Sequence, residues 1–242
     1  MTLKQAFIFA AGRGERMRPI TDSTPKPLVK VKGKAIIDYA IEKLDKISSI
    51  EKIIINGFYL AEQLEEHIKN LNNHKIIFSH ETEKLETGGG LIFAKDKINL
   101  NAPLLTINGD VLWFDDEIND IENLYKNWLK NQKNNNCDIL LGLKKTKDYF
   151  GYENANGGDF ALIENQNLLK KEKEMTHAFI GMQIINPKIL KKAPEKCFSI
   201  SHFYKNALMK NGILKNIKGF ELSSKYFHIG TEESLRDVEK LI

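Results

Sequence analysis

Short apolar runs and amphipathic helical patterns alternate along the chain as far as Leu143. The first run, at residues 5–11, is almost continuously apolar and stops at Gly12, which is typical of a strand buried on both faces. Strands that alternate with helices predict a mainly parallel sheet with right-handed crossovers. The expected strands are residues 5–11, 52–56, 75–79, 103–107 and 138–143, and the expected helices are residues 35–47, 60–69 and 118–130.

The pattern changes after Lys144, because the next apolar runs are no longer separated by long helical patterns. Residues 160–163 and 178–185 are expected to be strands, joined by polar loops at 151–158 and 165–175. Short helices are expected near 201–210 and 232–242. This arrangement predicts a small antiparallel addition beside the parallel part of the sheet.

Composition and charge exclude several classes of protein. The formal net charge is only +4, and the lysines are spread along the chain, so we interpret them as solvated surface rather than a nucleic-acid footprint. No window approaches the roughly 18 apolar residues of a membrane span, and the first residues lack a signal-peptide pattern. Cys137 and Cys197 match no metal-binding spacing. We therefore expect a cytoplasmic protein that binds neither nucleic acid nor membrane.

Residues 9–28, directly after the first expected strand, combine glycines, prolines and four cations. Glycine lets backbone N–H groups approach phosphate oxygens, and Arg and Lys match phosphate in geometry and charge. The stretch lacks the third glycine of a dinucleotide-binding fingerprint and the ending of a P-loop, which argues against a dehydrogenase. Solvated surface cations are the alternative interpretation. The residues concerned are Gly12, Arg13, Gly14, Arg16, Arg18 and Lys26.

The stretch AAGRGERMRP at residues 10–19, followed by TPKPL at 24–28, resembles the signature of the sugar-1-phosphate nucleotidyltransferases. LETGGG at 85–90, NGD at 108–110 and IGT at 229–231 follow in the family's order, so the resemblance spans nearly the whole chain. It implies a Rossmann-like α/β fold and an enzyme that joins a sugar 1-phosphate to a nucleoside triphosphate and releases pyrophosphate. The short length and the LETGGG segment most resemble the N-acetylmuramate α-1-phosphate uridylyltransferases of cell-wall recycling.

The resemblance also implies roles for individual residues. Arg16 is expected along the triphosphate and Lys26 at the reacting phosphates, where in-line attack builds negative charge. Asp110 follows an apolar strand and is expected to bind Mg²⁺, which prefers one or two carboxylates plus phosphate oxygens. Glycines before a helix would expose amides, and the amide near Gly88 is expected to help select the base. The nucleotide-binding residues implied are Ala10, Ala11, Gly12, Arg13, Gly14, Glu86, Thr87, Gly88 and Gly89.

His228 marks a departure from the family, whose second metal ligand at this position is an aspartate. Three interpretations remain open: His228 binds the metal with Asp110, it hydrogen-bonds a metal-bound water or a phosphate, or it is a structural histidine. Imidazole is a poorer Mg²⁺ ligand than carboxylate and suits softer ions, so Mn²⁺ is a possible cofactor beside Mg²⁺.

The sugar-binding part is less explicit in the sequence. The family's Glu-Lys-Pro unit is absent, and Lys170 and Lys171 lie near the expected region in a different context. We expect Asn108, Asp159 and Gly181 to contact the sugar. A single domain is expected, with a nucleotide-binding core at 1–145 and a sugar-phosphate-binding part at 146–242, as a monomer or small homo-oligomer.

Three alternatives follow from the same motifs, because most base and sugar contacts in the family come from the backbone. The first is a mannose- or heptose-1-phosphate guanylyltransferase, and the second is a glucose-1-phosphate thymidylyltransferase. The third is a nucleotide-sugar-binding homologue with weak turnover, which only the histidine at position 228 favours. The complete set of glycines, cations and Asp110 argues against that third alternative.

Overall fold

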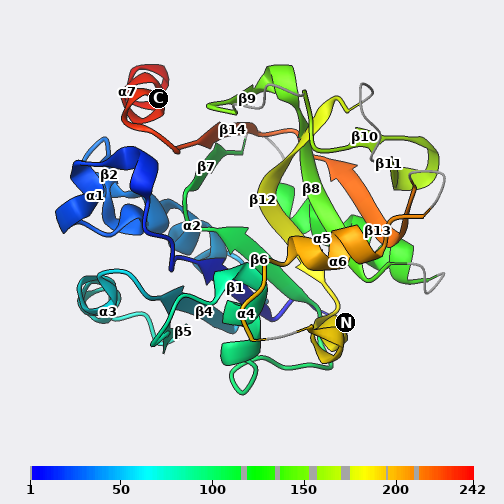
Figure 1. Cartoon of the computed structure of the whole chain (residues 1–242), viewed down its shortest axis with the longest axis horizontal. Helices are drawn as coiled ribbons and strands as arrows, with labels where there is room; N and C mark the ends of the chain where they lie inside the picture. Colours follow the sequence, from blue (N-terminus) through cyan, green and yellow to red (C-terminus); the bar gives the residue numbers. More distant parts are fainter. Residues whose placement is uncertain are drawn as a thin grey trace.

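A nine-stranded mixed sheet runs through the computed structural model (Figure 1). The structure describes residues 2–115, 119–133, 137–152, 157–169, 175–194, 196–209 and 213–242. The strand order is β10-β11-β13-β8-β12-β6-β1-β4-β5. In chain order the strands are β1 (Gln5–Phe9), β4 (Lys52–Gly57), β5 (Ile76–His80), β6 (Leu104–Asn108), β8 (Ile139–Lys145), β10 (Ala161–Leu162), β11 (Asn167–Leu169), β12 (His177–Ile185) and β13 (Ile213–Glu221).

The sheet is parallel through β5, β4, β1 and β6, and this part holds the first apolar runs of the sequence. β12 then pairs antiparallel with both β6 and β8, so β8 and its parallel neighbour β13 run in the same direction as β1. The outer strands β11 and β10 are antiparallel. The expected α/β fold with a mainly parallel sheet and an antiparallel addition is confirmed, and the addition continues the same sheet.

Helices cover both faces of the sheet, because the strands are apolar on both sides. Ala6 and Ile8 of β1 pack into one hydrophobic cluster, and Phe7 between them packs into the other. The first cluster lies under α2 (Ile36–Asp45), α3 (Ala61–Asn70) and α5 (Asp120–Gln132). The second lies under α4 (Glu86–Phe93) and α6 (Ser201–Asn206).

A second, three-stranded sheet lies beside the large one and pairs a strand from the C-terminal part of the chain with two strands from its middle. It pairs β7 (Val111–Phe114), β14 (Lys225–His228) and β9 (Tyr149–Phe150). After β14, helix α7 (Glu232–Leu241) packs against α1 (Ile20–Ser23) and the hairpin of β2 (Lys30–Val31) and β3 (Lys34–Ala35), as the red and blue segments in Figure 1 show. The pairing of His228 with Val111 brings the C-terminal part next to Asp110.

The predicted elements are present, with differences at their ends. The first strand stops at Phe9 rather than residue 11, and helix α5 begins at Asp120, while Ile118 lies outside the described residues. The helices expected near 201–210 and 232–242 are α6 and α7. The predicted loops at 151–158 and 165–175 lie partly outside the described residues. The short strands β2, β3 and β9 and the strands β7, β11, β13 and β14 were not predicted. Strand β11 corrects the loop expected at 165–175, and lysines and a glycine interrupt the apolar pattern of β13.

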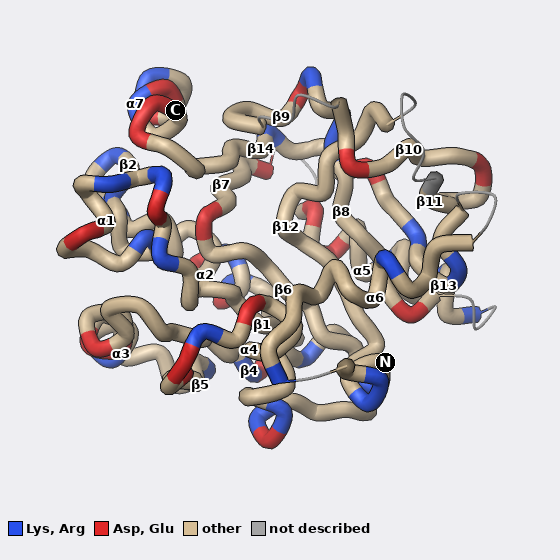
Figure 2. Tube along the Cα trace, viewed as in Figure 1, with Lys and Arg blue, Asp and Glu red and all other residues tan. Residues whose placement is uncertain are grey.

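Lysines and arginines occur along most of the trace, interleaved with acidic residues (Figure 2). Both cysteines are free; Cys137 is buried and Cys197 is exposed. Within the described part of the chain, no helix is both long and apolar enough to cross a membrane.

The fully buried carboxylate of Asp120 fixes the turn that leads into β14. It accepts hydrogen bonds from the backbone and hydroxyl of Ser223, from the backbone of Ser224 and from the Tyr226 hydroxyl, at 2.9–3.2 Å. Four donors therefore depend on one side chain.

We expect Asp120→Ala to lower the free energy of unfolding by about 3 kcal/mol or more, because it leaves several buried donors without an acceptor. Denaturant unfolding measures this, with Asp96→Ala as the control, since the Asp96 side chain is 68% exposed. Equal stability of the two variants would contradict the structural role of Asp120.

Candidate active site

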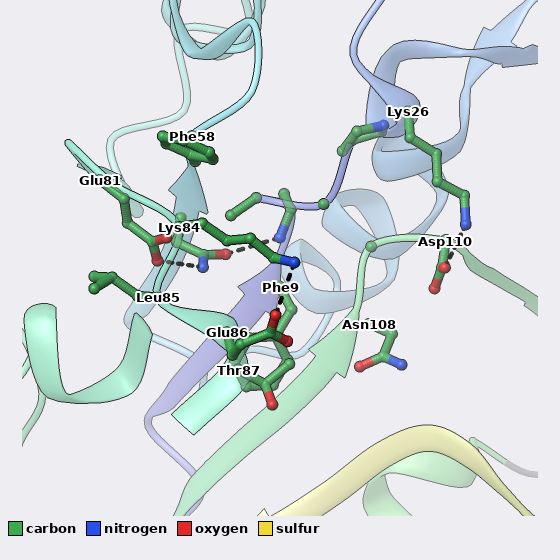
Figure 3. Close-up of a pocket in the computed structure, with 16 residues that line it drawn as sticks. Phe9, Lys26, Phe58, Glu81, Lys84, Leu85, Glu86, Thr87, Asn108 and Asp110 are labelled. Atoms are coloured by element: carbon green, nitrogen blue, oxygen red, sulfur yellow. Dashed lines mark hydrogen bonds and ion pairs between the residues drawn. The ribbon is translucent and has the colours of Figure 1, made fainter. Parts of the chain in front are cut away.

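The carboxyl ends of β1, β4, β5 and β6 surround a pocket, at the position where ligands bind in open α/β sheets (Figure 3). The connection from β5 crosses back over β1 to reach β6, so the strand order reverses direction there. Polar residues stand just after these apolar strands, because the backbone leaves the sheet at that level. The pocket is lined by Phe9, Ala10, Ala11, Gly12, Lys26, Pro27, Asn56, Phe58, Glu81, Lys84, Leu85, Glu86, Thr87, Asn108, Gly109 and Asp110.

A second depression adjoins this pocket on the side of the glycine-rich loop. The two share Lys26 and Asp110 at one boundary, and Lys84 and Glu86 at another. The residues that line only the second depression are Arg13, Gly14, Glu15, Arg16 and Gly230. The site is thus one elongated groove, with a partly apolar end under Glu81 and a more highly charged end beside Arg16.

Gly14 shapes the loop between these two ends. Its backbone has a φ of +66°, and a Cβ there would lie 2.9 Å from Thr21 Cγ2 and 3.0 Å from Lys26 Cβ. Its carbonyl accepts hydrogen bonds from the Thr21 hydroxyl and the Met17 amide, each at 2.8 Å. A glycine is required here so that the segment carrying Lys26 can pack against the loop. Gly12, by contrast, has nothing within 4 Å of an added Cβ.

The four cations of the loop have different surroundings. Arg18 pairs with Asp22 at 3.1 Å, and both side chains are more than half exposed. The guanidinium of Arg13 lies 5.9 Å from the ring centres of Phe58 and Tyr59. Arg16 lines the second depression, where its Nη2 would be 3.0 Å from a Cβ added at Gly230. Lys26 and Arg16 therefore face the groove, while Arg18 is held at the surface.

Lys26 and Asp110 form the shortest ion pair among the described residues of the groove. Lys26 Nζ lies 2.6 Å from Asp110 Oδ2, and the two side chains are 12% and 25% exposed. Burial by itself would raise the pKa of Asp110, but the Lys26 ammonium and His228 outweigh it and hold that pKa well below its usual range. The other oxygen, Asp110 Oδ1, is shielded from solvent and has no hydrogen-bond partner in the described part of the chain.

His228 stands beside this carboxylate. Its Nε2 lies 3.7 Å from Asp110 Oδ2, and its Nδ1 lies 3.3 Å from the Gly151 carbonyl oxygen. Because that carbonyl can only accept, the Nδ1–H of His228 donates to it, and Nε2 is the ring nitrogen that faces Asp110. An orphaned carboxylate oxygen directly before β7 and an imidazole nitrogen on its partner strand β14 fit a divalent cation. The described residues contain no cluster of three or more His, Cys, Asp or Glu side chains for a metal, so the remaining ligands would come from substrate.

The LETGGG segment requires a correction. The glycines were expected before a helix with free amides, but α4 begins at Glu86 and contains them. The Gly88 and Gly89 amides donate to the Phe198 carbonyl at 2.8 and 3.0 Å, so they are not available to a base. Thr87 accepts from the Ile200 amide at 2.9 Å. The glycines allow the 196–200 segment to pack closely, since a Cβ at Gly88 would lie 2.3 Å from the Phe198 ring.

Glu86 lines the groove, as do Leu85 and Thr87 of the same segment. It lies in the left-handed region with a φ of +60°, which is strained for a residue with a side chain. Its carboxylate pairs with Lys84 Nζ at 3.0 Å across the mouth of the pocket, as Figure 3 shows.

Of the three residues expected to contact the sugar, one lines the pocket and two do not. Asn108 lines the pocket, and Gly181, with a φ of +77°, leaves room for the Asn108 side chain, which would lie 2.8 Å from an added Cβ. Asp159 accepts from the Phe179 amide at 2.9 Å and so anchors β12. Neither Asp159 nor Gly181 lines the two depressions. Lys170 and Lys171 lie outside the described residues.

Sequence reasoning missed a group of residues at the base of the pocket. Asn56 Oδ1 accepts from the Ala10 amide at 2.8 Å, and Asn56 Nδ2 donates to Glu81 Oε1 at 2.7 Å. Glu81 is 2% exposed, and burial raises its pKa to about 7 against the opposing effect of Asn56. Phe58 and Lys84 complete the group. A signal for Asn56 was available in the sequence, because Asn56 ends the apolar run KIIIN just as Asn108 directly follows PLLTI.

The chain matches the family described as nucleotidyl transferase over residues 5–192. The chain belongs to the nucleotidyl transferase family. Among characterised relatives, it is 28% identical over 237 residues to the N-acetylmuramate alpha-1-phosphate uridylyltransferase of Caulobacter vibrioides, covering 96% of this chain and 93% of that protein. It is 30% identical over 202 residues to the catalytic subunit beta of the mannose-1-phosphate guanylyltransferase of Drosophila pseudoobscura pseudoobscura, covering 81% of this chain and 52% of that protein.

A solved structure confirms the fold of this nucleotidyl transferase. The crystal structure of HddC from Yersinia pseudotuberculosis superposes with a TM-score of 0.73 at 21% identity, over 99% of each chain. Together with the family match, the relatives identify an enzyme of the sugar-1-phosphate nucleotidyltransferase group.

The buried Glu81 predicts a pH-dependent effect on stability. Its pKa in the folded protein, about 7, is above the ordinary value of 4.5, so the folded state binds more protons between these limits and loses stability as the pH rises through them. Glu81→Gln keeps the shape of the uncharged acid and removes this loss.

We expect Glu81→Gln to be more stable than the wild-type protein at pH 8, by on the order of 1–3 kcal/mol, and close to it at pH 4.5. Denaturant unfolding at the two pH values measures the difference. A stability difference that does not change with pH would contradict the environment described for Glu81.

Proposed function

We propose that this nucleotidyl transferase joins N-acetylmuramate 1-phosphate to UTP in the cytoplasm, giving UDP-N-acetylmuramate and pyrophosphate, as in cell-wall recycling. The observation that carries the reaction is the Lys26–Asp110 pair, at 2.6 Å, on the boundary between the two ends of the groove. The choice of sugar and base is supported by similarity to the uridylyltransferase, which covers 93% of that relative.

In this proposal the chain acts mainly through positioning and charge. Arg16 lies along the triphosphate, and Lys26 leaves Asp110 to contact the α-phosphate, where negative charge grows during in-line attack. The attacking oxygen belongs to the sugar phosphate and is already an anion, so the mechanism requires no general base. Arg13 contributes supporting charge, and Gly14 maintains the loop shape.

Asp110 and His228 are the residues that would hold a divalent cation, Mg²⁺ or Mn²⁺. When bound, it would offset the charge of the phosphates and bring the two substrates together. Asp110 supplies the orphaned Oδ1, and His228 supplies Nε2. Release of Asp110 Oδ2 by Lys26 would free a second oxygen of the same carboxylate.

The nucleoside and the sugar would be contacted by different residues of the groove. Ala10, Ala11 and Gly12 would contact the nucleoside through their backbone, with Glu86 and Thr87 on the opposite wall. The sugar would lie toward β12, contacted by Asn108 and Gly181, with Asp159 supporting that strand. The Gly88 and Gly89 amides are omitted from these contacts because Phe198 occupies them.

A second candidate is a mannose-1-phosphate guanylyltransferase. It is favoured by the 30% identity to the Drosophila protein over 81% of this chain. The base-facing carboxyl of Glu81 also suits guanine, whose edge presents two adjacent donors.

Pyrophosphate release tests the proposed function. We expect release with UTP and N-acetylmuramate 1-phosphate in Mg²⁺ or Mn²⁺, above the release with CTP or ATP. Lys26→Ala should lower kcat by about 100-fold or more, since it removes a charge that stabilises the transition state. Lys30→Ala, an exposed lysine on β2, is the matched control and should retain activity.

Release with GTP and mannose 1-phosphate but not with UTP would establish the second candidate. An absence of release with every pair would support a binding protein with little turnover.

A substitution at His228 tests the metal ligands. His228→Asp adds a second carboxylate, which Mg²⁺ prefers over imidazole, so we expect the Mg²⁺ concentration for half-maximal activity to fall by about tenfold. His228→Ala should raise it. Metal titrations of the three proteins measure these changes, and an unchanged metal dependence in both variants would rule out His228 as a ligand.

A further inference from the structure

Glu81 is a carboxyl group at the closed end of the nucleotide pocket, and its position is tightly constrained. A Cβ on Gly90 would lie 2.7 Å from Glu81 Oε1 and 2.9 Å from Asn56 Nδ2, so the backbone of α4 packs directly against the pair. Gly90 is therefore required by local packing, which the sequence motif alone does not show. It allows a buried carboxyl and a buried amide to meet beneath the pocket.

The orientation of Glu81 follows from a chain of hydrogen bonds that begins on β1. The Ala10 amide donates to Asn56 Oδ1, which fixes which end of the Asn56 amide carries the donors. Asn56 Nδ2 then donates to Glu81 Oε1 at 2.7 Å. Glu81 Oε2 has no hydrogen-bond partner among the described residues. Because Glu81 lines the pocket, Oε2 is available to a bound ligand, with Oε1 beside it.

No cation in the described pocket lining is paired with Glu81. Lys26 pairs with Asp110, and Lys84 pairs with Glu86. On β5 itself, the neighbouring His80 lies near Glu62 and Glu65, on helix α3. Asn56 on β4 and Gly90 on α4 are uncharged. Burial therefore dominates and raises the pKa of Glu81 to about 7, so the acid and the carboxylate are both populated near neutral pH.

The two forms match different nucleobases. The acid presents a donor at Oε2 beside an acceptor at Oε1, which complements the adjacent C=O and N–H of uracil. The carboxylate presents two acceptors, which complement the adjacent N–H and NH₂ of guanine. The carboxylate placed against uracil sets an acceptor against a C=O, and the acid paired with the C=O and N–H of guanine leaves the adjacent NH₂ without an acceptor from Glu81; buried mismatches of this kind are discriminating.

We propose that the protonation state of Glu81 sets the base selectivity of the enzyme, with the acid form accepting UTP and the carboxylate form accepting GTP. The inference rests on the proposed function and deepens it. The preference between UTP and GTP would then change gradually with pH, because it depends on whether one buried carboxyl group carries its proton. The same enzyme could therefore have both the uridylyltransferase and the guanylyltransferase activity for which its relatives are named.

The test is the ratio of kcat/KM for UTP to that for GTP, measured by pyrophosphate release between pH 5.5 and 8.5. The ratio cancels effects of pH on the metal, the phosphates and the sugar phosphate. We expect it to fall with rising pH by up to about tenfold per pH unit, as for a single proton. ITP adds a probe of purine size, because its base presents C=O beside N–H without the NH₂, so ITP should follow UTP rather than GTP.

Variants separate Glu81 from other groups. Glu81→Gln fixes a donor beside an acceptor, so its UTP-to-GTP ratio should stay constant with pH and at least as high as the wild-type ratio at pH 5.5. Glu62→Gln, at a side chain 83% exposed on α3, is the control and should keep the wild-type trend.

A wild-type ratio that is constant with pH, while pyrophosphate is released, would overturn this inference and leave the proposed function standing. A pH-dependent ratio in Glu81→Gln would also overturn it. Failure to release pyrophosphate with any triphosphate would overturn the proposed function and this inference together. The wild-type measurement needs no variant, so the test does not depend on how Glu81→Gln folds.

Discussion

The parallel pairing of β1 with β4 on one side and β6 on the other is the constraint on which the site depends. Ile8 is in register with Ile55 and with Ile107, so all three strands end at the same level. Two hydrogen bonds then connect the ends: the Gly109 amide donates to the Phe9 carbonyl at 2.9 Å, and the Ala10 amide donates to Asn56. Because these strands are buried on both faces, a one-residue shift in register would turn each side chain into the opposite hydrophobic cluster and disrupt the packing of both, so the polar ends are held in place.

The two ends of the groove differ in charge. At one end, Lys26, Arg16 and Asp110 provide charges that suit phosphates and a cation. At the other end, Glu81 lies away from those ion pairs, and burial keeps much of it uncharged near pH 7. A triphosphate requires a charged environment and a neutral base requires an uncharged one. The loop from Ala10 to Lys26 runs from one of these ends of the groove to the other.

The sequence predicts the parallel core well because those strands and helices have strong, uninterrupted patterns. Lys26 and Asp110 both line the groove. Asp110 was indicated by its place after an apolar strand, and Lys26 by the resemblance of TPKPL to the family's motif. The sequence does not predict that Gly88 and Gly89 bond to Phe198, because that contact joins segments more than 100 residues apart. Glu81 was missed for a related reason. It is one of three glutamates in HETEKLE, and only the packing of Asn56 and Gly90 distinguishes it from its neighbours.

The central claim is that a nucleotide binds along this groove, with its base at Glu81 and its phosphates at Lys26. A crystal structure of the protein with UTP and Mg²⁺ tests it most directly. The account predicts that Lys26 Nζ moves from Asp110 to a phosphate oxygen and that the uracil edge lies against Glu81. A nucleotide bound elsewhere, or one bound in the groove with the Lys26–Asp110 pair intact and its base away from Glu81, would contradict the account.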